Sequence, residues 1–217
     1  MGAKTWMLVI ADRDPRELLA GKPALDRQKT TDVAQALFPK DQLEALPDGD
    51  LMFTCPPDNE IVIGCFPGLT VIAAKEFAID APSELPPQFL AHAASRDVFL
   101  HAMHSTVDWL AFALWRNGQL VRSLSLAPDG GVIEDEGPHL PFELPYWSGE
   151  HPAMDPEDVD PDEPPYPFAF HPLDLGEAAL KEFFGYQLEG LVDPALLDPE
   201  TVVLMRFKRK KSWFKLW

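Results

Sequence analysis

The sequence is short of basic residues, of cysteine and of long apolar runs. It has 18 Lys and Arg residues against 35 Asp and Glu residues, which gives a net charge of −17. Nucleic acid is normally met by basic surface, so a chain this acidic repels a phosphate backbone and no nucleic-acid partner is expected. The same charge favours solubility and predicts a monomer or weak dimer.

Two further absences concern the compartment. The chain has only two cysteines, Cys55 and Cys65, and both lie in apolar, strand-like runs. A buried free cysteine behaves there as a small hydrophobic residue, so no disulfide is expected. No stretch approaches eighteen apolar residues, which predicts no transmembrane segment. The apolar run near the N-terminus is too short for a signal peptide, and the expected location is cytoplasmic.

Motifs for a cofactor or a metal are also missing. Asp129-Gly130-Gly131 lacks the lysine and the following helix that a phosphate-binding loop needs, and it reads as a turn. His101 and His104 are three residues apart, but on a strand they point to opposite faces and do not form a metal site. Neither a cofactor nor a metal is predicted.

The sequence does contain the material for a folded core, since 46% of its residues are hydrophobic. Ala3 to Ala11 is nearly continuous apolar sequence, which is typical of a buried central strand. Further strands are predicted over 51–54, 60–66, 69–75 and 201–208, with three more within 97–127. Helices are predicted over 16–20 and 84–94, from Thr30 or Thr31 to Phe38, and from a cap at Asp174 to Phe184.

These elements predict an α+β fold with a largely antiparallel sheet of about seven to eight strands and three to five short helices. The length of 217 residues fits one large domain. We expect that domain to cover 1–207, including a proline-rich loop over 128–172, and to be followed by a basic, aromatic tail over 208–217.

The clearest local signal is a hairpin at Asn117-Gly118, because this dipeptide favours a two-residue turn. An uninterrupted register from that turn pairs Trp115 with Leu120 and Trp109 with Leu126. Leu124 and Leu126 would then share a face with the two tryptophans. Apolar residues fall on both faces of this hairpin, so the sheet is expected to be covered on both.

The segment from Pro128 to Pro172 loses all periodicity. Ten of the 23 prolines lie between Pro138 and Pro172, and an acidic run occupies its middle. Loops this long are usually lids, partner surfaces or disordered segments. Aromatic residues predict that its two ends pack on the body, and the acidic middle, about 153–165, is expected to be mobile.

Within this loop, one cluster has the composition of a small-ligand site. It combines two aromatic residues with an acid and a histidine: Tyr146, Trp147, Glu150 and His151. Aromatic walls with a few converging polar groups are what small-molecule pockets use. The alternative is that Tyr146 and Trp147 only hold the proline-rich loop against the sheet.

A second candidate is the pair of His101 and Asp108. If Ser105-Thr106 were a tight turn, His101 would pair with Leu110 and lie diagonal to Asp108 on one face. A histidine beside a carboxylate is a common catalytic pair. Ser125 would lie too far away to act as its nucleophile, because Leu110 intervenes. The alternative is a structural hydrogen bond between the two side chains.

The C-terminal tail is the third candidate, as a contact surface. It interleaves basic and aromatic residues, among them Lys208, Arg209, Lys210, Lys211, Trp213 and Trp217. Such a segment suits peripheral contact with an anionic membrane. The alternatives are that its charges pair with the acidic body or with a protein partner, or that it stays disordered.

Several long strings resemble one known family. They are MGAKT at 1–5, HAMHSTVDWLAF at 101–112, LVRSLSL at 120–126, PYWSGEHP at 145–152 and FHPLDLGEA at 170–178. The chain resembles the actinobacterial family of uncharacterised proteins called domain of unknown function 6928. The resemblance covers nearly the whole chain and implies a cytosolic bacterial protein. It implies no activity and no catalytic residue.

Two functional hypotheses follow. The first is a non-enzymatic binding or protein-interaction module that works through the 138–172 loop or the tail. The second is an enzyme of unknown class, perhaps a hydrolase, with a pocket beneath the 138–172 loop that uses His101 and Asp108 or Glu150 and His151.

Overall fold

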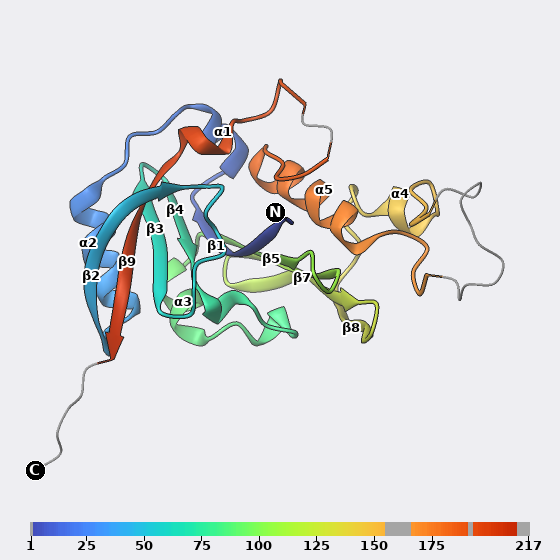
Figure 1. Cartoon of the computed structure of the whole chain (residues 1–217), viewed down its shortest axis with the longest axis horizontal. Coiled ribbons are helices and arrows are strands. Elements are labelled where there is room, and N and C mark those ends of the chain that lie inside the picture. The colour runs from blue at the N-terminus through green and yellow to red at the C-terminus, as the bar shows by residue number, and fades with distance from the viewer. Residues whose placement is uncertain (1, 155–165, 191–192, 212–217) are drawn as a thin grey trace, which may run out of the picture.

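The computed structural model describes residues 2–154, 166–190 and 193–211, and within them the chain forms one antiparallel sheet of nine strands (Figure 1). Across the sheet the strands run in the order β2-β9-β3-β4-β1-β5-β6-β7-β8. Their bounds are β1 (Lys4–Ala11), β2 (Asp41–Asp50), β3 (Glu60–Phe66), β4 (Leu69–Ala73), β5 (Asp97–His104), β6 (Trp109–Arg116), β7 (Gln119–Ala127), β8 (Gly131–Glu136) and β9 (Val203–Lys211).

Five α-helices and three short 3₁₀ helices complete the described part of the chain. The α-helices are α1 (Pro15–Ala20), α2 (Arg27–Leu37), α3 (Pro87–Ala93), α4 (Leu144–Trp147) and α5 (Pro172–Phe184). The 3₁₀ helices are η1 (Lys75–Phe77), η2 (Pro82–Glu84) and η3 (Pro199–Thr201).

The sheet is covered on both faces, as its apolar strands predict. In β1, Met7 and Val9 point into the core beneath α1 and α5, whereas Leu8 and Ile10 point into the core beneath α2 and α3. This alternation follows from the two-residue period of a strand. β1 is the fifth of nine strands, so the predicted buried central strand is confirmed.

Helix α5 lies very close to the sheet. A Cβ added at Gly176 would lie 3.1 Å from Leu110 Cδ1 and from Met103 Sδ, so only glycine permits this approach without displacement. The helix ends at Gly185, whose φ of 78° is the left-handed conformation that glycine favours. At this end an ion pair of 3.3 Å joins Glu182 to Arg16 of α1.

The predicted number of strands was too low, because the two edge strands were missed. The segment 51–54, predicted as a strand, is a turn and loop that follows β2. Both β2 and β8 bond to the sheet along one side only, and much of each is exposed. An edge strand needs little apolar alternation, so the pattern that reveals buried strands was absent there.

The predicted hairpin register was wrong beyond the turn. Trp115 does pair with Leu120, but the next pair is Leu114 with Arg122, so Val121 is an extra residue in a β-bulge. The bulge turns Leu124 and Leu126 to the opposite face, beneath α5 and away from Trp109 and Trp115.

Several helix boundaries also differ from those predicted. Asp26, rather than a threonine, caps α2, and the Thr30 hydroxyl instead accepts a hydrogen bond from the Cys65 amide. The helix predicted over 84–94 is divided into η2 and α3. His171, rather than Asp174, caps α5. The 128–172 segment contains β8 and α4. Mobility was expected for 153–165, and residues 155–165 of that range lie outside the described residues.

The C-terminal strand is longer than predicted and takes in part of the basic segment. β9 continues to Lys211, and Lys208 pairs with Glu44 in the register with β2. Arg209 forms ion pairs with Asp41 at 2.7 Å and with Glu76 at 2.6 Å. Lys210 pairs with Glu44 at 2.6 Å. These contacts match the alternative in which basic residues pair with the acidic body, and Trp213 and Trp217 lie outside the described residues.

The turn after β8 offers a test of the packing. Gly137 has a φ of 80°, and a Cβ there would lie 2.1 Å from the carbonyl oxygen of Val121. Gly149 has a similar φ of 84° but open space around it, so it is a matched control. We expect Gly149→Ala to cost about 1–2 kcal/mol through its backbone conformation. Gly137→Ala should cost clearly more, because overpacking adds about 1–3 kcal/mol. Urea denaturation measures both, and equal losses would contradict the close contact.

Candidate functional site

His101 is fully buried in β5, and both of its ring nitrogens are engaged. Nε2 donates to the carbonyl oxygen of Gly176 at 3.0 Å, and Nδ1 accepts from the Thr5 hydroxyl at 2.7 Å. A carbonyl oxygen only accepts, so this arrangement requires the neutral ring with its proton on Nε2. Burial lowers the pKa of His101 to about 4, against a smaller opposing effect of the Gly176 carbonyl. The ring joins β1, β5 and α5 and has no free nitrogen for a substrate.

Asp108 is not the neighbour of His101. The turn between β5 and β6 has four residues rather than two, so His101 pairs with Phe112 and Met103 pairs with Leu110. The predicted register was therefore wrong by two residues. Asp108 lies in the turn, with its carboxylate 3.5 Å from His171 Nε2 and 3.5 Å from the Tyr166 hydroxyl. Burial, followed by the charge of Asp108, raises the pKa of Tyr166 to about 12.

The loop cluster divides into two halves. Tyr146 stacks on His151 at 4.5 Å between ring centroids and donates its hydroxyl to the carbonyl oxygen of Asp174 at 3.1 Å. Trp147 turns the other way, where it stacks on His139 at 4.8 Å and meets the edge of Phe170. Glu150 is exposed and accepts from the Ser148 hydroxyl at 2.9 Å. The structure therefore brings together Tyr146 and His151 but not the other two.

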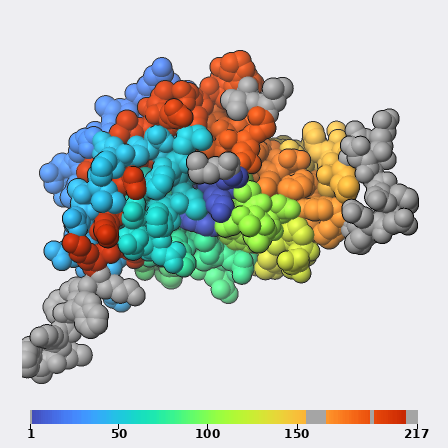
Figure 2. Space-filling model, viewed as in Figure 1, coloured from blue at the N-terminus to red at the C-terminus, as the bar shows by residue number. Residues whose placement is uncertain are grey.

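A pocket of about 600 Å³ lies between the 146–153 segment of the proline-rich loop and α5, and we call it the loop pocket. Figures 1 and 2 show the yellow and orange segments around α4 and the start of α5 at the end of the molecule remote from β2. One wall is the face of α5 with Asp174, Glu177, Ala178 and Lys181, spaced as one helical face requires. The facing residues include Tyr146, His151, His171, Gln187 and Glu189.

The loop pocket has an acidic character with one buried carboxylate at its base. Glu177 accepts backbone hydrogen bonds from Leu188 at 2.8 Å and from Glu189 at 3.2 Å, which ties the 188–190 segment to α5. Burial raises the pKa of Glu177 to about 7 against these two hydrogen bonds, and the charges of Glu189 and Asp174 add to the rise. Among the described residues, the buried oxygen Oε1 of Gln187 has no hydrogen-bond partner.

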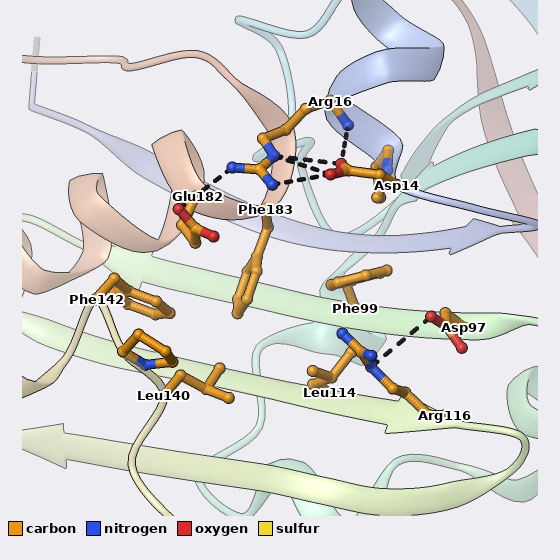
Figure 3. Close-up of a pocket in the computed structure, with 12 residues that line it drawn as sticks. Asp14, Arg16, Asp97, Phe99, Leu114, Arg116, Leu140, Phe142, Glu182 and Phe183 are labelled. Atoms are coloured by element: carbon orange, nitrogen blue, oxygen red, sulfur yellow. Dashed lines mark hydrogen bonds and ion pairs between the residues drawn. The ribbon is translucent and has the colours of Figure 1, made fainter.

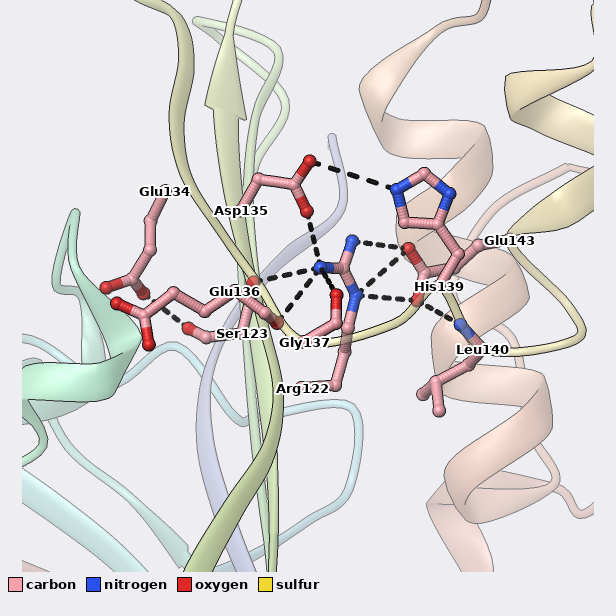
Figure 4. A network of polar contacts seen from close by, with 9 residues as sticks. All are labelled: Arg122, Ser123, Glu134, Asp135, Glu136, Gly137, His139, Leu140 and Glu143. Carbon is pink, nitrogen blue, oxygen red and sulfur yellow. Dashed lines mark hydrogen bonds and ion pairs between the residues drawn. The ribbon is translucent and has the colours of Figure 1, made fainter.

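A buried ion pair that the sequence did not predict links the loop to β7. Arg122 and Glu143 both have fully buried side chains, and Arg122 donates to the Glu143 carboxylate from Nε at 2.9 Å and from Nη2 at 2.7 Å. Nη1 donates to Asp135 and to the carbonyl oxygens of Glu136 and Gly137 (Figure 4). Burial lowers the pKa of Arg122, but the hydrogen bonds to Glu143 and Asp135 outweigh it and the net shift is upward.

The same ion pair connects the strand to the loop cluster. The Leu140 amide donates to the Glu143 carboxylate at 2.8 Å, and the carbonyl oxygen of Glu143 accepts from the amides of Tyr146 and Trp147. The signal for this pair was a single arginine in the apolar run LVRSLSL, since a buried charge needs a partner of opposite sign. Sequence alone did not indicate which carboxylate that partner is.

Comparison with known proteins identifies the family but no function. The model of a family of unknown function, DUF6928, matches residues 5–207. The chain belongs to this family. No curated protein and no solved structure matches the chain.

Three further findings concern metal sites, membrane-spanning helices and thiols in this DUF6928 member. Within residues 2–154, 166–190 and 193–211, no group of three or more His, Cys, Asp or Glu side chains is arranged to hold a metal ion. In the same residues, no helix is long and apolar enough to cross a membrane. Cys55 and Cys65 are both free thiols.

The buried His101 gives this fold an acid-sensitive contact. The pKa of the ring is about 4 in the folded protein and about 6.5 in the unfolded chain, so the unfolded state binds the proton first. This contribution to stability is complete above pH 6.5 and is lost as the pH falls through 4. On going from pH 7 to pH 5, the protein loses about 2 kcal/mol of stability through this group.

We expect His101→Gln to lower stability at pH 7, because Gln replaces only part of the bonding, and to lose less on acidification than the wild type. Urea denaturation at pH 7 and pH 5 gives the two differences. An equal loss in both proteins would show that His101 does not take up a proton on unfolding.

Proposed function

We propose that this DUF6928 protein is a non-enzymatic binding module that takes a small organic ammonium ion, such as an alkyl amine, in the loop pocket. The observation that carries the proposal is the set of three carboxylates that line the pocket, next to the Gln187 side chain, whose buried Oε1 has no hydrogen-bond partner within the described residues. A ligand with both positive charge and N–H donors suits that combination.

The charges around the pocket favour a cation. Asp174, Glu177 and Glu189 line it against one lysine, Lys181. The raised pKa of Glu177 means that negative charge is already unfavourable there, and a bound cation relieves this.

The shape and polarity of the pocket favour an amine with an apolar body. The stacked rings of Tyr146 and His151 provide flat walls for methylene groups. Gln187 Oε1 needs a hydrogen-bond donor, which a primary ammonium group supplies and a quaternary ammonium group lacks. The pocket volume of about 600 Å³ is in the range of small-molecule sites.

The hydrolase alternative has less support. It needed a base within hydrogen-bond reach of a nucleophile, at about 2.6–3.2 Å. His101 is buried with both nitrogens engaged, and Asp108 contacts Tyr166 and His171 instead. Of the other pair, His151 lines the loop pocket but Glu150 does not.

We also propose a location, an origin and an oligomeric state for this protein. We take it to be a cytoplasmic protein of actinobacterial origin and a monomer or weak dimer, supported by its family resemblance and its acidity. The 138–172 loop and the C-terminal segment are the surfaces we propose for any protein partner or peripheral membrane contact. Four of the proposed contact residues, Lys208, Arg209, Lys210 and Lys211, lie in β9.

Calorimetric titration at pH 7.5 tests the loop pocket with three probes. We expect 1,4-diaminobutane to bind with a stoichiometry of one. The bis-quaternary analogue of this diamine, with three methyl groups on each nitrogen, has both charges without the donors, and 1,4-butanediol has the shape without the charge. Both should bind at least about tenfold more weakly. Equal binding of the three probes, or none by the diamine, would contradict the proposal.

Two variants assign the binding to this pocket. Asp174 is exposed, so Asp174→Asn should leave the fold intact and weaken 1,4-diaminobutane binding about tenfold, and Gln187→Leu should do the same. Asp32→Asn, on the exposed face of α2, makes the same change in net charge and should have no effect. Losses of equal size in all three would indicate a non-specific attraction to the acidic surface.

A further inference from the structure

A second pocket, of about 370 Å³, lies on the same face of the sheet where α5 ends. Its floor is apolar and largely aromatic, with Phe99 and Leu114 from the sheet, Phe142 from the loop and Phe183 from α5. Phe99 meets Phe183 at 5.4 Å between ring centroids, and Phe142 meets it at 5.5 Å. We call this the Arg116 pocket, and it shares no lining residue with the loop pocket.

Two arginines, Arg16 and Arg116, flank this floor and differ in how their guanidinium groups are paired (Figure 3). Arg16 is already paired, because it donates to both oxygens of Asp14 and forms an ion pair with Glu182 at 3.3 Å. Arg116 lies on the other side, next to Phe99 and Leu114.

Its closest acidic partner, Asp97, is 3.9 Å away, and Arg116 donates no hydrogen bond to any side chain or carbonyl in the described part of the chain. Its side chain is 61% exposed. A guanidinium group has five N–H donors in a planar fork that matches a carboxylate. Arg116 therefore keeps N–H donors for an anion above an aromatic floor, beside its 3.9 Å ion pair with Asp97, whereas Arg16 already donates hydrogen bonds to Asp14.

We infer that the Arg116 pocket binds a small aromatic carboxylate, with its ring against Phe99 and Phe183 and its carboxylate on the Arg116 guanidinium. The aromatic floor selects a flat apolar ring through edge and offset contacts. Two carboxylates, Asp14 and Glu182, surround Arg16, whereas one, Asp97, lies beside Arg116. The ligand carboxylate is therefore directed to Arg116. This site stands independently of the loop pocket and of its proposed amine.

The test uses phenylacetate against two matched probes, followed by amide chemical shifts of the full chain. Phenylacetate should bind saturably and shift the amides of Phe99, Leu114 and Phe183. Phenylacetamide, which keeps the ring and shape but has no charge, and acetate, which keeps only the carboxylate, should each bind at least about tenfold more weakly.

Variants decide whether Arg116 is the anion-binding group. Arg116 is exposed at the end of β6, so Arg116→Gln should fold normally and weaken phenylacetate binding about tenfold or more. Arg13→Gln removes a nearby exposed arginine that pairs with Glu17 outside the pocket, and it should bind as the wild type does.

Three outcomes would overturn the inference: phenylacetamide binding as tightly as phenylacetate, unchanged affinity in Arg116→Gln, or shifts confined to other parts of the sheet. None of them bears on the loop pocket, because a carboxylate is not the ligand proposed there. Conversely, absence of diamine binding would leave the phenylacetate result unchanged.

Discussion

The buried ion pair between Arg122 and Glu143 is the interaction on which the functional end of this molecule depends. Both side chains are fully buried, and together with Asp135 and the carbonyl oxygens of Glu136 and Gly137 they satisfy most of the donors of the guanidinium group. A buried charge left without its partner costs about 3–5 kcal/mol, so the strand and the loop that follows it are strongly coupled. The proline-rich segment is therefore fixed to β7 by an ion pair between two fully buried residues that lie 21 positions apart in the sequence.

The attachment of the loop to β7 through Arg122 and Glu143 positions residues that line both proposed pockets. On one side of Glu143, Leu140 and Phe142 form part of the Arg116 pocket. On the other side, the carbonyl oxygen of Glu143 accepts from the amide of Tyr146, which lines the loop pocket. Helix α5 is the wall shared by the two pockets, and it is held to the sheet by the close approach at Gly176 and by the His101 hydrogen bond. A rigid sheet thus presents two cavities whose outer walls come from a loop, which is a common arrangement for binding sites.

The parts of the fold that the sequence predicted are those in which the local signal and the tertiary environment agree. The apolar run of β1, the turn at Asn117-Gly118 and the end of the last helix at Phe184 were each predicted, and all three are present. The edge strands β2 and β8 were missed because they are largely polar and exposed. The bulge at Val121 was missed because one inserted residue leaves no trace in a two-residue pattern. For the sites, Tyr146 and His151 were predicted from composition. Glu177 and Gln187 reach the loop pocket, and Arg116 reaches its own pocket, only through the tertiary fold.

Hydrogen exchange across the 138–151 segment tests the role of the ion pair most directly. Glu143→Gln removes the charge of the buried carboxylate, whereas Glu150→Gln removes an exposed carboxylate in the same segment that accepts a hydrogen bond from Ser148. We expect faster exchange in this segment for Glu143→Gln, at an unchanged rate in β1 and β5, and wild-type exchange for Glu150→Gln. Wild-type protection of 138–151 in Glu143→Gln would contradict the account, because the loop would then be held in place by packing alone.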